Sequence, residues 1–369
     1  MLSTNKNWHY KAVTENIPLV SVIIPMYNAV RFISQTLESL ACQTMQDFEV
    51  IVVDDCSTDN SVLVVESFAE RFKAGVPLHV VKLPTNTGMP YLPRNVGVQF
   101  ARGKYLVFLD NDDLFTQTAL EELSTLAEEY QADVINMPDF FLVKDKWSKM
   151  KDLVNPANHT RWHCAWSKVP RPEKVQVVSD DIAERVKIWL DNGFHWATYA
   201  LFCRKDFWIA NRLNFPHMPV SDDMLAIFSS ICFAKKLLRV PNVTYIHRER
   251  ADSISQEKTD AKKFIHRWVS NLTLGFRALE EILNRLPFFK EHPDYAYAVS
   301  DWFFNRAVND AAYFPTVYSQ ISPATLKELV TKEFHSENVD FAAYLFNTVN
   351  IQRLQIMRLQ QELAKFQKQ

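Results

Sequence analysis

The sequence predicts an α/β fold: a Rossmann-like, mostly parallel sheet flanked by helices, followed by a mainly helical C-terminal extension. Two observations support this prediction. In the first third of the chain, short apolar runs rich in β-branched residues alternate with segments that carry apolar residues at helical spacing. The strand-like runs are continuously apolar, which indicates a parallel sheet that is covered on both faces.

The expected strands and helices alternate regularly through this first third. The first strand, 19–24, is stopped by Pro25. Further strands are expected at 48–53, 78–83, 105–109 and 133–137. Helices are expected at 31–43, 60–72 and 116–130, and another one ends near Gly103. Ligands of such sheets bind beyond the carboxyl ends of the strands, so the residues that follow each strand are the candidates for a site.

The rest of the chain has a weaker pattern. Many Trp, His and Pro residues interrupt the periodicity between about 140 and 220, which indicates an elaborated region. Helices are expected at 224–234, 262–286 and 295–312. The predicted parts are an N-terminal extension, two halves of the sheet domain, a helical region and a terminal amphipathic helix: 1–17, 18–138, 139–258, 259–344 and 345–369.

The terminal segment carries apolar residues at heptad-like spacing from Leu345 to Phe366, with Gln352 breaking the seam. This pattern fits a short coiled coil that joins two copies of the chain, and it fits equally a helix packed on its own domain. Basic residues such as Arg353 and Arg358 leave peripheral contact with acidic lipid as a third alternative.

The composition is that of a soluble globular protein, with 47% hydrophobic and 23% charged residues. The net charge of −2 gives no basic field for a nucleic-acid partner. The polar start lacks the apolar core of a signal peptide, and five scattered cysteines without a CxxC pair indicate neither a disulfide framework nor a zinc site. A cytoplasmic location is expected, with the inner face of the cell membrane as an alternative.

Carboxylates directly follow two of the predicted strands. Asp54 and Asp55 come after the second strand, and Asp110, Asp112 and Asp113 come after the fourth. Carboxylates gathered at one sheet edge repel one another unless they bind something positive, and a hard divalent cation shared with phosphate oxygens meets that need. Such residues also form turns and helix caps. A metal role is favoured for Asp110 and Asp112, whereas Asp113 is also a candidate cap for the helix expected near residue 116.

Two nucleotide-binding alternatives can be excluded. A nicotinamide-binding Rossmann domain needs a glycine fingerprint after its first strand, and here that turn, 25–29, contains no glycine. The phosphate-binding GxxxxGK[ST] motif of P-loop proteins is absent from the whole sequence. The chain is therefore predicted to be neither a dehydrogenase of that type nor a P-loop kinase.

Four segments together resemble the family-2 glycosyltransferases, which have the GT-A fold and include many bacterial enzymes of cell-surface polysaccharide synthesis. The segments are PLVSVIIPMYN at 18–28, FEVIVVDDCSTD at 48–59, RNVG at 94–97 and ARGKYLVFLDNDD at 101–113. Their order and spacing agree with the family, and the likeness continues more loosely to about residue 255. The resemblance implies a nucleotide-sugar donor site in the first half of the sheet domain and an acceptor site in the second.

The resemblance also implies roles for single residues. Tyr27, after Pro25, packs on the nucleotide base, and Asp55 hydrogen-bonds that base, usually uracil. Arg94 lies near the nucleotide as a fixed donor. In the DxD motif, Asp112 binds Mn²⁺ or Mg²⁺ directly, and Asp110 faces ribose or sugar and is a second candidate ligand. The nucleotide-sugar contacts expected in this half are Pro25, Tyr27, Asp55, Arg94, Asp110, Asn111 and Asp112.

The acceptor half carries a counterpart of the family's acidic pair, Asp222-Asp223, where the family commonly has Glu-Asp. By alignment Asp223 is the base that takes the proton of the acceptor hydroxyl, although the departure leaves Asp222 as the other candidate. A helix N-cap is the alternative role for this segment. Farther on, His247 is expected to complete the metal shell or touch the pyrophosphate, and Arg248 or Arg250 to neutralise it.

The resemblance implies a metal-dependent, inverting glycosyltransferase that moves a sugar from a nucleoside diphosphate, with UDP as the expected nucleotide, to a hydroxyl of a saccharide, a glycoconjugate or a lipid-linked saccharide. The alternative is a non-catalytic nucleotide-sugar-binding protein or assembly partner, which would not need the acid pair. A glycoside hydrolase also needs two carboxylates but would leave Tyr27, Asp55 and the DxD motif unexplained. Trp196, Tyr199 and Trp208 are either acceptor-binding or core residues.

Overall fold

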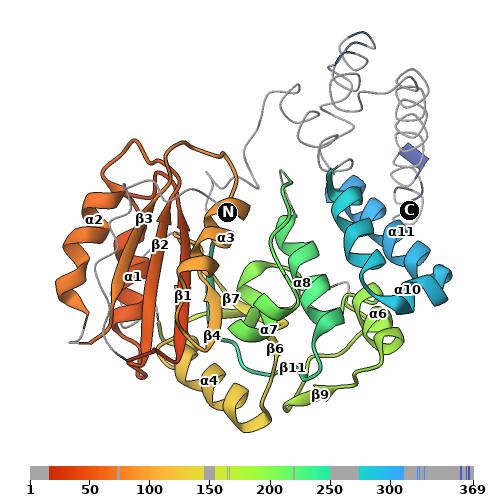
Figure 1. Cartoon of the computed structure of the whole chain (residues 1–369), viewed down its shortest axis with the longest axis horizontal. Coiled ribbons are helices and arrows are strands. Elements are labelled where there is room, and N and C mark those ends of the chain that lie inside the picture. The colour runs from red at the N-terminus through yellow and green to blue at the C-terminus, as the bar shows by residue number, and fades with distance from the viewer. Residues whose placement is uncertain are drawn as a thin grey trace. The chain divides into compact units, whose positions relative to one another are not determined.

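The computed structural model describes residues 16–72, 75–144, 154–163, 165, 167–218, 221–249 and 274–310, with a few isolated positions beyond them. The chain divides into two compact units (Figure 1). The first comprises Met1–His217 and Asp222–Ser253, and the second comprises Met218–Ser221 and Ile254–Gln369. Most of the predicted terminal helix at 345–369, and all but two residues of the predicted extension at 1–17, lie outside the described residues.

The first unit is built on an eight-stranded sheet in the order β3-β2-β1-β4-β10-β6-β11-β9. Strand β1 pairs in parallel with both β2 and β4, and β2 pairs in parallel with β3. The strands of this sheet are β1 (Val20–Met26), β2 (Phe48–Asp54), β3 (Leu78–Lys82), β4 (Tyr105–Phe108), β6 (Val134–Asn136), β9 (Gln176–Val178), β10 (Leu201–Arg204) and β11 (Leu237–Arg239). The five predicted strands are all present, and the predicted α/β class is confirmed.

The sheet differs from a simple parallel one at its centre. Strand β10 lies between β4 and β6 and is antiparallel to both. The fourth and fifth predicted strands are therefore not neighbours. The four residues of β10 come from the region without a clear pattern, and so short a segment carries no readable periodicity.

A smaller, four-stranded sheet in the order β5-β12-β7-β8 also belongs to the first unit. Its strands are β5 (Leu114–Phe115), β7 (Asp139–Lys144), β8 (Thr160–His163) and β12 (Tyr245–Glu249). Strand β12 is antiparallel to β5 and parallel to β7. Because β5 begins immediately after Asp113, this pairing brings β12 directly against the DxD loop.

The helices agree with most of the predicted segments. Those of the first unit are α1 (Ile33–Ala41), α2 (Ser61–Phe68), α3 (Tyr91–Phe100), α4 (Ala119–Tyr130), α6 (Ile182–Leu190), α7 (Lys205–Ala210) and α8 (Asp222–Phe233). The second unit contains α10 (Pro287–Glu291) and α11 (Pro293–Asp310). The helices expected at 31–43, 60–72, 116–130, 224–234 and 295–312 are confirmed, and the segment expected at 262–286 lies partly outside the described residues.

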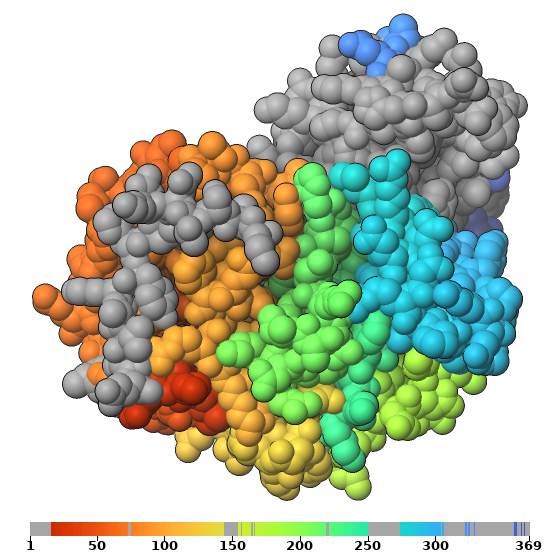
Figure 2. All heavy atoms as spheres, viewed as in Figure 1, coloured from red at the N-terminus to blue at the C-terminus, as the bar shows by residue number. Residues whose placement is uncertain are grey.

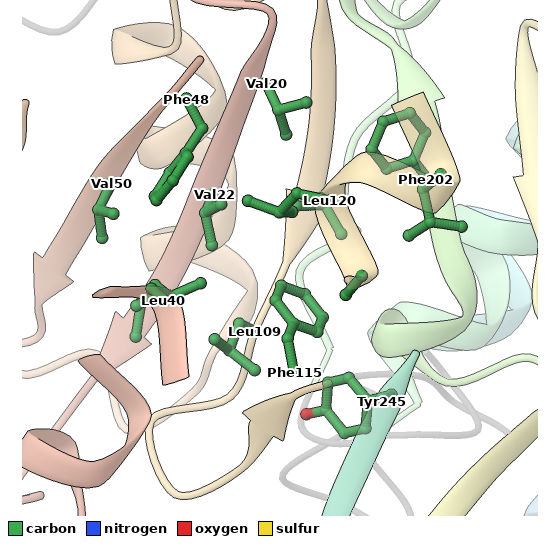
Figure 3. Packing of buried hydrophobic residues seen from close by; sticks show 14 of the residues in the cluster. Val20, Val22, Leu40, Phe48, Val50, Leu109, Phe115, Leu120, Phe202 and Tyr245 are labelled. Atoms are coloured by element: carbon green, nitrogen blue, oxygen red, sulfur yellow. The ribbon is translucent and has the colours of Figure 1, made fainter. Parts of the chain in front are cut away.

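The main core is formed by the continuously apolar strands and the helices packed on them. Val20 and Val22 of β1 are fully buried, and so are Leu109 and Phe115, which flank the DxD loop. Figure 3 shows Phe115 lying between Leu109 and Tyr245. The ring centres of Phe115 and Tyr245 are 5.8 Å apart. The loop that carries the carboxylates is thus held at both ends by buried apolar side chains.

Two glycines, Gly97 in α3 and Gly103 in the turn after it, pack closely on β1. A Cβ atom on Gly97 would lie 2.4 Å from Cγ2 of Ile23 in β1, and one on Gly103 would lie 2.6 Å from the backbone nitrogen of Ser21. These contacts are too short for a side chain, so both positions require glycine for close packing on β1. Gly97 thereby lets α3, which carries Arg94, lie against β1.

Candidate active site

The loops after β1 and β2 form one connected surface at the carboxyl edge of the sheet. Asn28 has a positive φ of 47°, and its side-chain oxygen accepts a 2.8 Å hydrogen bond from the backbone of Thr58. In return, the backbone nitrogen of Asn28 donates to the hydroxyl of Ser57. Beside them Tyr27 is 46% exposed, and a tyrosine side chain that reaches the surface can pack on a planar ligand.

Asp55 is buried and organises the loop before α3. Both of its carboxylate oxygens accept from the backbone nitrogen of Thr87, at 3.0 and 3.1 Å, and the Thr87 hydroxyl adds a bond of 2.9 Å. Burial raises the pKa of Asp55 although these hydrogen bonds lower it. A carboxylate has about four lone-pair sites, so Asp55 keeps capacity to accept one more donor.

The DxD loop presents its first and third residues differently from its second. The side chain of Asp110 is 36% exposed, and Asp112 is half-buried. The side-chain amide of Asn111 instead donates a 2.9 Å bond to the carbonyl of Pro25, while the backbone carbonyl of Asn111 accepts from the hydroxyl of Thr36. Pro25 and Asn111 thereby tie the loop to the end of β1, and the two aspartates remain at the edge of the sheet.

Asp113 has a different role from the helix cap that was the alternative for it. Helix α4 begins at Ala119, and the residue at its N-cap position is Thr118. The carboxylate of Asp113, only 1% exposed, accepts from the hydroxyl of Tyr245 at 2.7 Å and from the backbone nitrogen of Arg248 at 2.7 Å. It is the residue that fastens β12 to the DxD loop.

His247 lies over the same carboxylate. Its Nδ1 atom is 3.0 Å from a carboxylate oxygen of Asp113. Burial would lower the pKa of His247, but the charge and hydrogen bond of Asp113, with Asp110 and Asp112 nearby, raise it to about 9. The ring adds positive charge beside the DxD carboxylates.

Of the two arginines predicted to neutralise the diphosphate, Arg248 is buried against α1. Arg248 is 2% exposed, donates to Gln35 at 2.9 Å and lies 4.6 Å from the ring centre of Phe32. Its guanidinium therefore contacts α1 and the turn before it. Arg250 lies outside the described residues.

Arg94 joins the two groups of carboxylates. One terminal nitrogen donates to Asp110 at 3.1 Å, and the other donates to Asp222 at 3.1 Å. The side chain is 7% exposed and lies 5.4 Å from the ring of Phe215. Burial opposes its charge, but Asp222 and Asp110 outweigh burial and raise the pKa of Arg94. The DxD loop and the start of α8 therefore form a single site, and Figure 2 shows the green atoms around α8 beside the orange atoms around α3.

The acid pair begins α8, and its members face different surroundings. Asp222 is 3% exposed and is the partner of Arg94, whereas Asp223 is half-buried. Asp223 accepts a 2.9 Å bond from the backbone nitrogen of Met224. Burial, followed by the charge of Asp222, raises the pKa of Asp223 to about 7. Such a carboxyl exchanges a proton near neutral pH, as a general base must.

Of the three aromatic candidates, Tyr199 lies nearest the site. Its ring stacks on Tyr245 at 4.4 Å, and its hydroxyl is 3.2 Å from Nε2 of His195. Burial and the carboxylates of Asp113 and Asp223 raise the pKa of Tyr199. Trp196, half-buried, packs near His195, and Trp208 is 1% exposed among core rings, so Trp208 is a core residue.

A divalent cation fits the oxygen donors of the DxD loop. Asp110 and Asp112 supply hard carboxylate ligands of the kind that Mg²⁺ and Mn²⁺ prefer. In the part of the chain that the structure describes, no three His, Cys, Asp or Glu side chains are arranged to hold a metal by themselves. These carboxylates therefore suit an ion that takes its remaining ligands from phosphate oxygens and water.

A comparison with protein-family models shows which family the chain belongs to. The family model described as glycosyl transferase family 2 matches residues 21–206, about half of the chain. The chain belongs to glycosyltransferase family 2. The matched residues contain Tyr27, Asp55, Arg94 and the DxD loop, so the resemblance seen in the sequence is confirmed.

Individual relatives match different lengths of this family-2 chain. The poly(ribitol-phosphate) β-N-acetylglucosaminyltransferase TarS of Staphylococcus aureus is 39% identical over 117 residues, which are 31% of this chain and 20% of TarS. The uncharacterized glycosyltransferase EpsJ of Bacillus subtilis is 28% identical over 241 residues, 65% of this chain and 64% of EpsJ. The match thus spans only about a fifth of the length of TarS.

A solved structure confirms the fold. The crystal structure of S. aureus TarS 1-349 in complex with UDP-GlcNAc superposes with a TM-score of 0.58 at 22% identity and covers 87% of this chain and 82% of that chain. The predicted GT-A arrangement is therefore present. Among the described residues, no helix has the length and apolar character needed to cross a membrane.

The structure brings most of the predicted site residues together at one sheet edge and adds some that the sequence did not indicate. His195, Tyr91 and His217 lie at or beside this edge without having been assigned to it, and Asp113 contacts β12 instead of capping a helix. Tyr91 stands three residues before Arg94, so a helical reading of that segment would have placed both on one face. His195 and His217 lie in the unpatterned region, where no sequence signal pointed to them.

Proposed function

We propose that this chain is an inverting glycosyltransferase that moves a sugar from a UDP-linked donor to a hydroxyl of a saccharide or glycoconjugate acceptor, with Mn²⁺ or Mg²⁺. The observation that carries this proposal is the double contact of Arg94, which ties Asp110 of the DxD loop to Asp222 of the acid pair. Charge stabilisation for a leaving diphosphate and a base for an acceptor are thereby held next to each other.

The donor would lie along the carboxyl edge of the sheet. The exposed ring of Tyr27 offers a face for the base, and Asp55 keeps an acceptor for its N–H group. UDP is favoured as the nucleotide because TarS, a family member with the same fold, has a structure with UDP-GlcNAc. Asp112 and Asp110 would hold the metal, which supplies charge stabilisation for the diphosphate when bound.

The proposed reaction is a single displacement. The acceptor oxygen forms a bond to the anomeric carbon, its proton passes to a carboxylate oxygen of Asp223, and the bond from that carbon to the diphosphate breaks. Asp222 and Arg94 position Asp223 and neutralise charge around it. His247, which stands over Asp113, adds positive charge near the departing diphosphate.

A panel of nucleotide sugars tests this proposal. The purified chain, incubated with Mn²⁺ and each of several UDP- and GDP-sugars, is expected to release UDP from at least one UDP-sugar, slowly with water and faster with a suitable acceptor. Release of nucleoside diphosphate is measured by a coupled assay. No release from any donor, together with no binding of UDP in calorimetry, would contradict the proposed function.

A further inference from the structure

Tyr91 and His217 form a pair of rings beside Arg94, and neither has a part in the reaction proposed above. Tyr91 is the first residue of α3, and His217 follows α7 in the chain. Their ring centres are 4.9 Å apart, with an angle of 40° between the rings. Tyr91 is half-buried and His217 is exposed, so the pair has a covered side and an open side.

The pair is placed by the neighbours of Arg94. The side chain of Asn95 donates to the carbonyl of Phe215 at 2.8 Å and accepts from its backbone nitrogen at 2.9 Å. Two residues later the chain reaches His217. The ring of Phe215 also lies against the guanidinium of Arg94. The Arg94-Asn95 pair therefore holds both the carboxylates of the site and the segment that carries His217.

Tyr91, the other ring of the pair, is positioned by the loop that Asp55 holds. Asp55 accepts from the backbone nitrogen of Thr87, and the Thr87 hydroxyl lies within hydrogen-bond distance, 3.0 Å, of the carbonyl oxygen of Met89, two residues before Tyr91. Residues three apart on a helix share a face, so Tyr91 lies on the face of α3 that carries Arg94. Burial, and then the charges of Asp55 and Asp222, raise the pKa of Tyr91, so its hydroxyl keeps its proton at neutral pH.

Tyr91 is thus close to the base-recognition end of the site and to the acid pair. A donor with its base at Asp55 and its reacting carbon beside Asp223 must extend between these two ends. A phenol hydroxyl and an imidazole can donate to and accept from sugar hydroxyls, and ring faces suit the apolar face of a hexose. Building on the proposed function, we infer that Tyr91 and His217 contact the sugar of the donor and determine which sugar is accepted.

Two substitutions that preserve the rings test this inference. Tyr91→Phe removes the hydroxyl, and His217→Phe keeps an aromatic ring but removes the nitrogens. Each is assayed with UDP-glucose, UDP-galactose, UDP-GlcNAc and UDP-GalNAc, and UDP affinity is measured by calorimetry with Mn²⁺. For the preferred donor, kcat/KM is expected to fall about 10-fold in each variant, the loss of roughly one hydrogen bond. The ratio of kcat/KM for the preferred donor to that for the second-best donor should fall as well, while the Kd of UDP changes by less than about twofold.

Tyr297→Phe is the matched control, because Tyr297 is an exposed tyrosine of the second unit and should leave every value unchanged. If both ring variants kept the wild-type order and ratio of donors, the inference would be wrong while the proposed function stood. An equal loss of UDP affinity and turnover would also overturn it, because the pair would then serve the nucleotide or the loop. Absence of UDP binding by the wild-type chain would overturn the proposed function and this inference together.

Discussion

Arg94 shows how one buried side chain can organise two carboxylate groups that are far apart in the sequence. Its planar guanidinium offers directed N–H groups, and two of them reach Asp110 and Asp222 at the same distance of 3.1 Å. A lysine keeps the charge but offers a single nitrogen, which cannot reproduce this fork. The position of Asp222, and through it of Asp223, therefore depends on the shape of Arg94 as well as on its charge.

Arg94→Lys is expected to lower kcat by about 10-fold or more, because a small displacement of the base from the reacting atoms is costly. KM for the donor should change less than kcat, since Arg94 acts through the carboxylates. Steady-state kinetics with the preferred donor measures both constants. The control is Arg71→Lys, in an exposed ion pair with Glu38. Equal kinetics for Arg94→Lys and the wild type would rule out this positioning role.

The pKa of Asp223 gives a pH dependence. Burial and Asp222 raise this pKa to about 7, and the carboxyl can take a proton only when it is ionised. The rate should therefore fall as the pH drops through about 7 and level off above it, and kcat/KM reports this ionisation in the free enzyme. A kcat/KM profile that stays level from about pH 5 to pH 8 would contradict the assignment of Asp223.

At the same scale, the sequence predicted the kinds of residue in the site better than their contacts. The positions of Asp55, Arg94 and Asp110 follow from motif spacing, because the strand ends and the start of a helix bring them together. Asp113 was open to interpretation as a cap, since a carboxylate before a helix looks the same whichever group it bonds. Its true partners, Tyr245 and Arg248, come from β12, more than 130 residues later.

At the scale of elements, segment 213–217 is tied to α3 by the two hydrogen bonds between the Asn95 side chain and the backbone of Phe215, in addition to the ring contacts of Arg94 and Tyr91. Two hydrogen bonds to one backbone residue replace the pairing that a strand would otherwise provide. The same segment carries Phe215 under Arg94. The conformation of segment 213–217 therefore affects Arg94 and, through it, the acid pair Asp222-Asp223.

Asn95→Ala should destabilise the fold by about 1–3 kcal/mol, because two polar groups of Phe215 lose their partners. Turnover of the folded variant should also fall, since the support under Arg94 is loosened. Chemical denaturation and kinetics at low temperature measure the two effects. Asn60→Ala is the control, because Asn60 is exposed and makes no side-chain cap bond. A variant as stable as the control would show that the Asn95–Phe215 bonds contribute little.

The elements that could not be predicted from the sequence are short strands that pair with segments far away in the chain. The strands β1, β2 and β4 are buried runs and were readable from periodicity. Strand β10 has four residues and pairs with segments on either side that are distant in the chain. Its place in the sheet is decided by tertiary packing, which a local pattern does not record.

At the scale of the whole molecule, the family relationship fixes the fold and the donor edge but not the substrate. The family model ends at residue 206, before the acid pair and β12. A fold shared with TarS carries no information on the choice of sugar or acceptor. Substrate identity therefore has to be measured.

Ligand binding should be visible in the stability of the whole chain. UDP with Mn²⁺ at about 100 times its Kd is expected to stabilise the fold by roughly 2.7 kcal/mol, and so to raise Tm. UDP without metal should raise Tm less, because the carboxylates of Asp110 and Asp112 then repel the diphosphate. In Asp112→Asn the difference made by the metal should disappear. An equal Tm with and without Mn²⁺ in the wild type would count against the metal site.

The most direct test of the account is the variant Asp223→Asn, which keeps the size of the side chain but removes the base. Calorimetry should show UDP binding in the presence of Mn²⁺ with wild-type affinity, and transfer from the preferred donor should be abolished. Asp206→Asn, at an exposed aspartate of α7, is the matched control and should transfer normally. Wild-type turnover by Asp223→Asn would contradict the proposed mechanism.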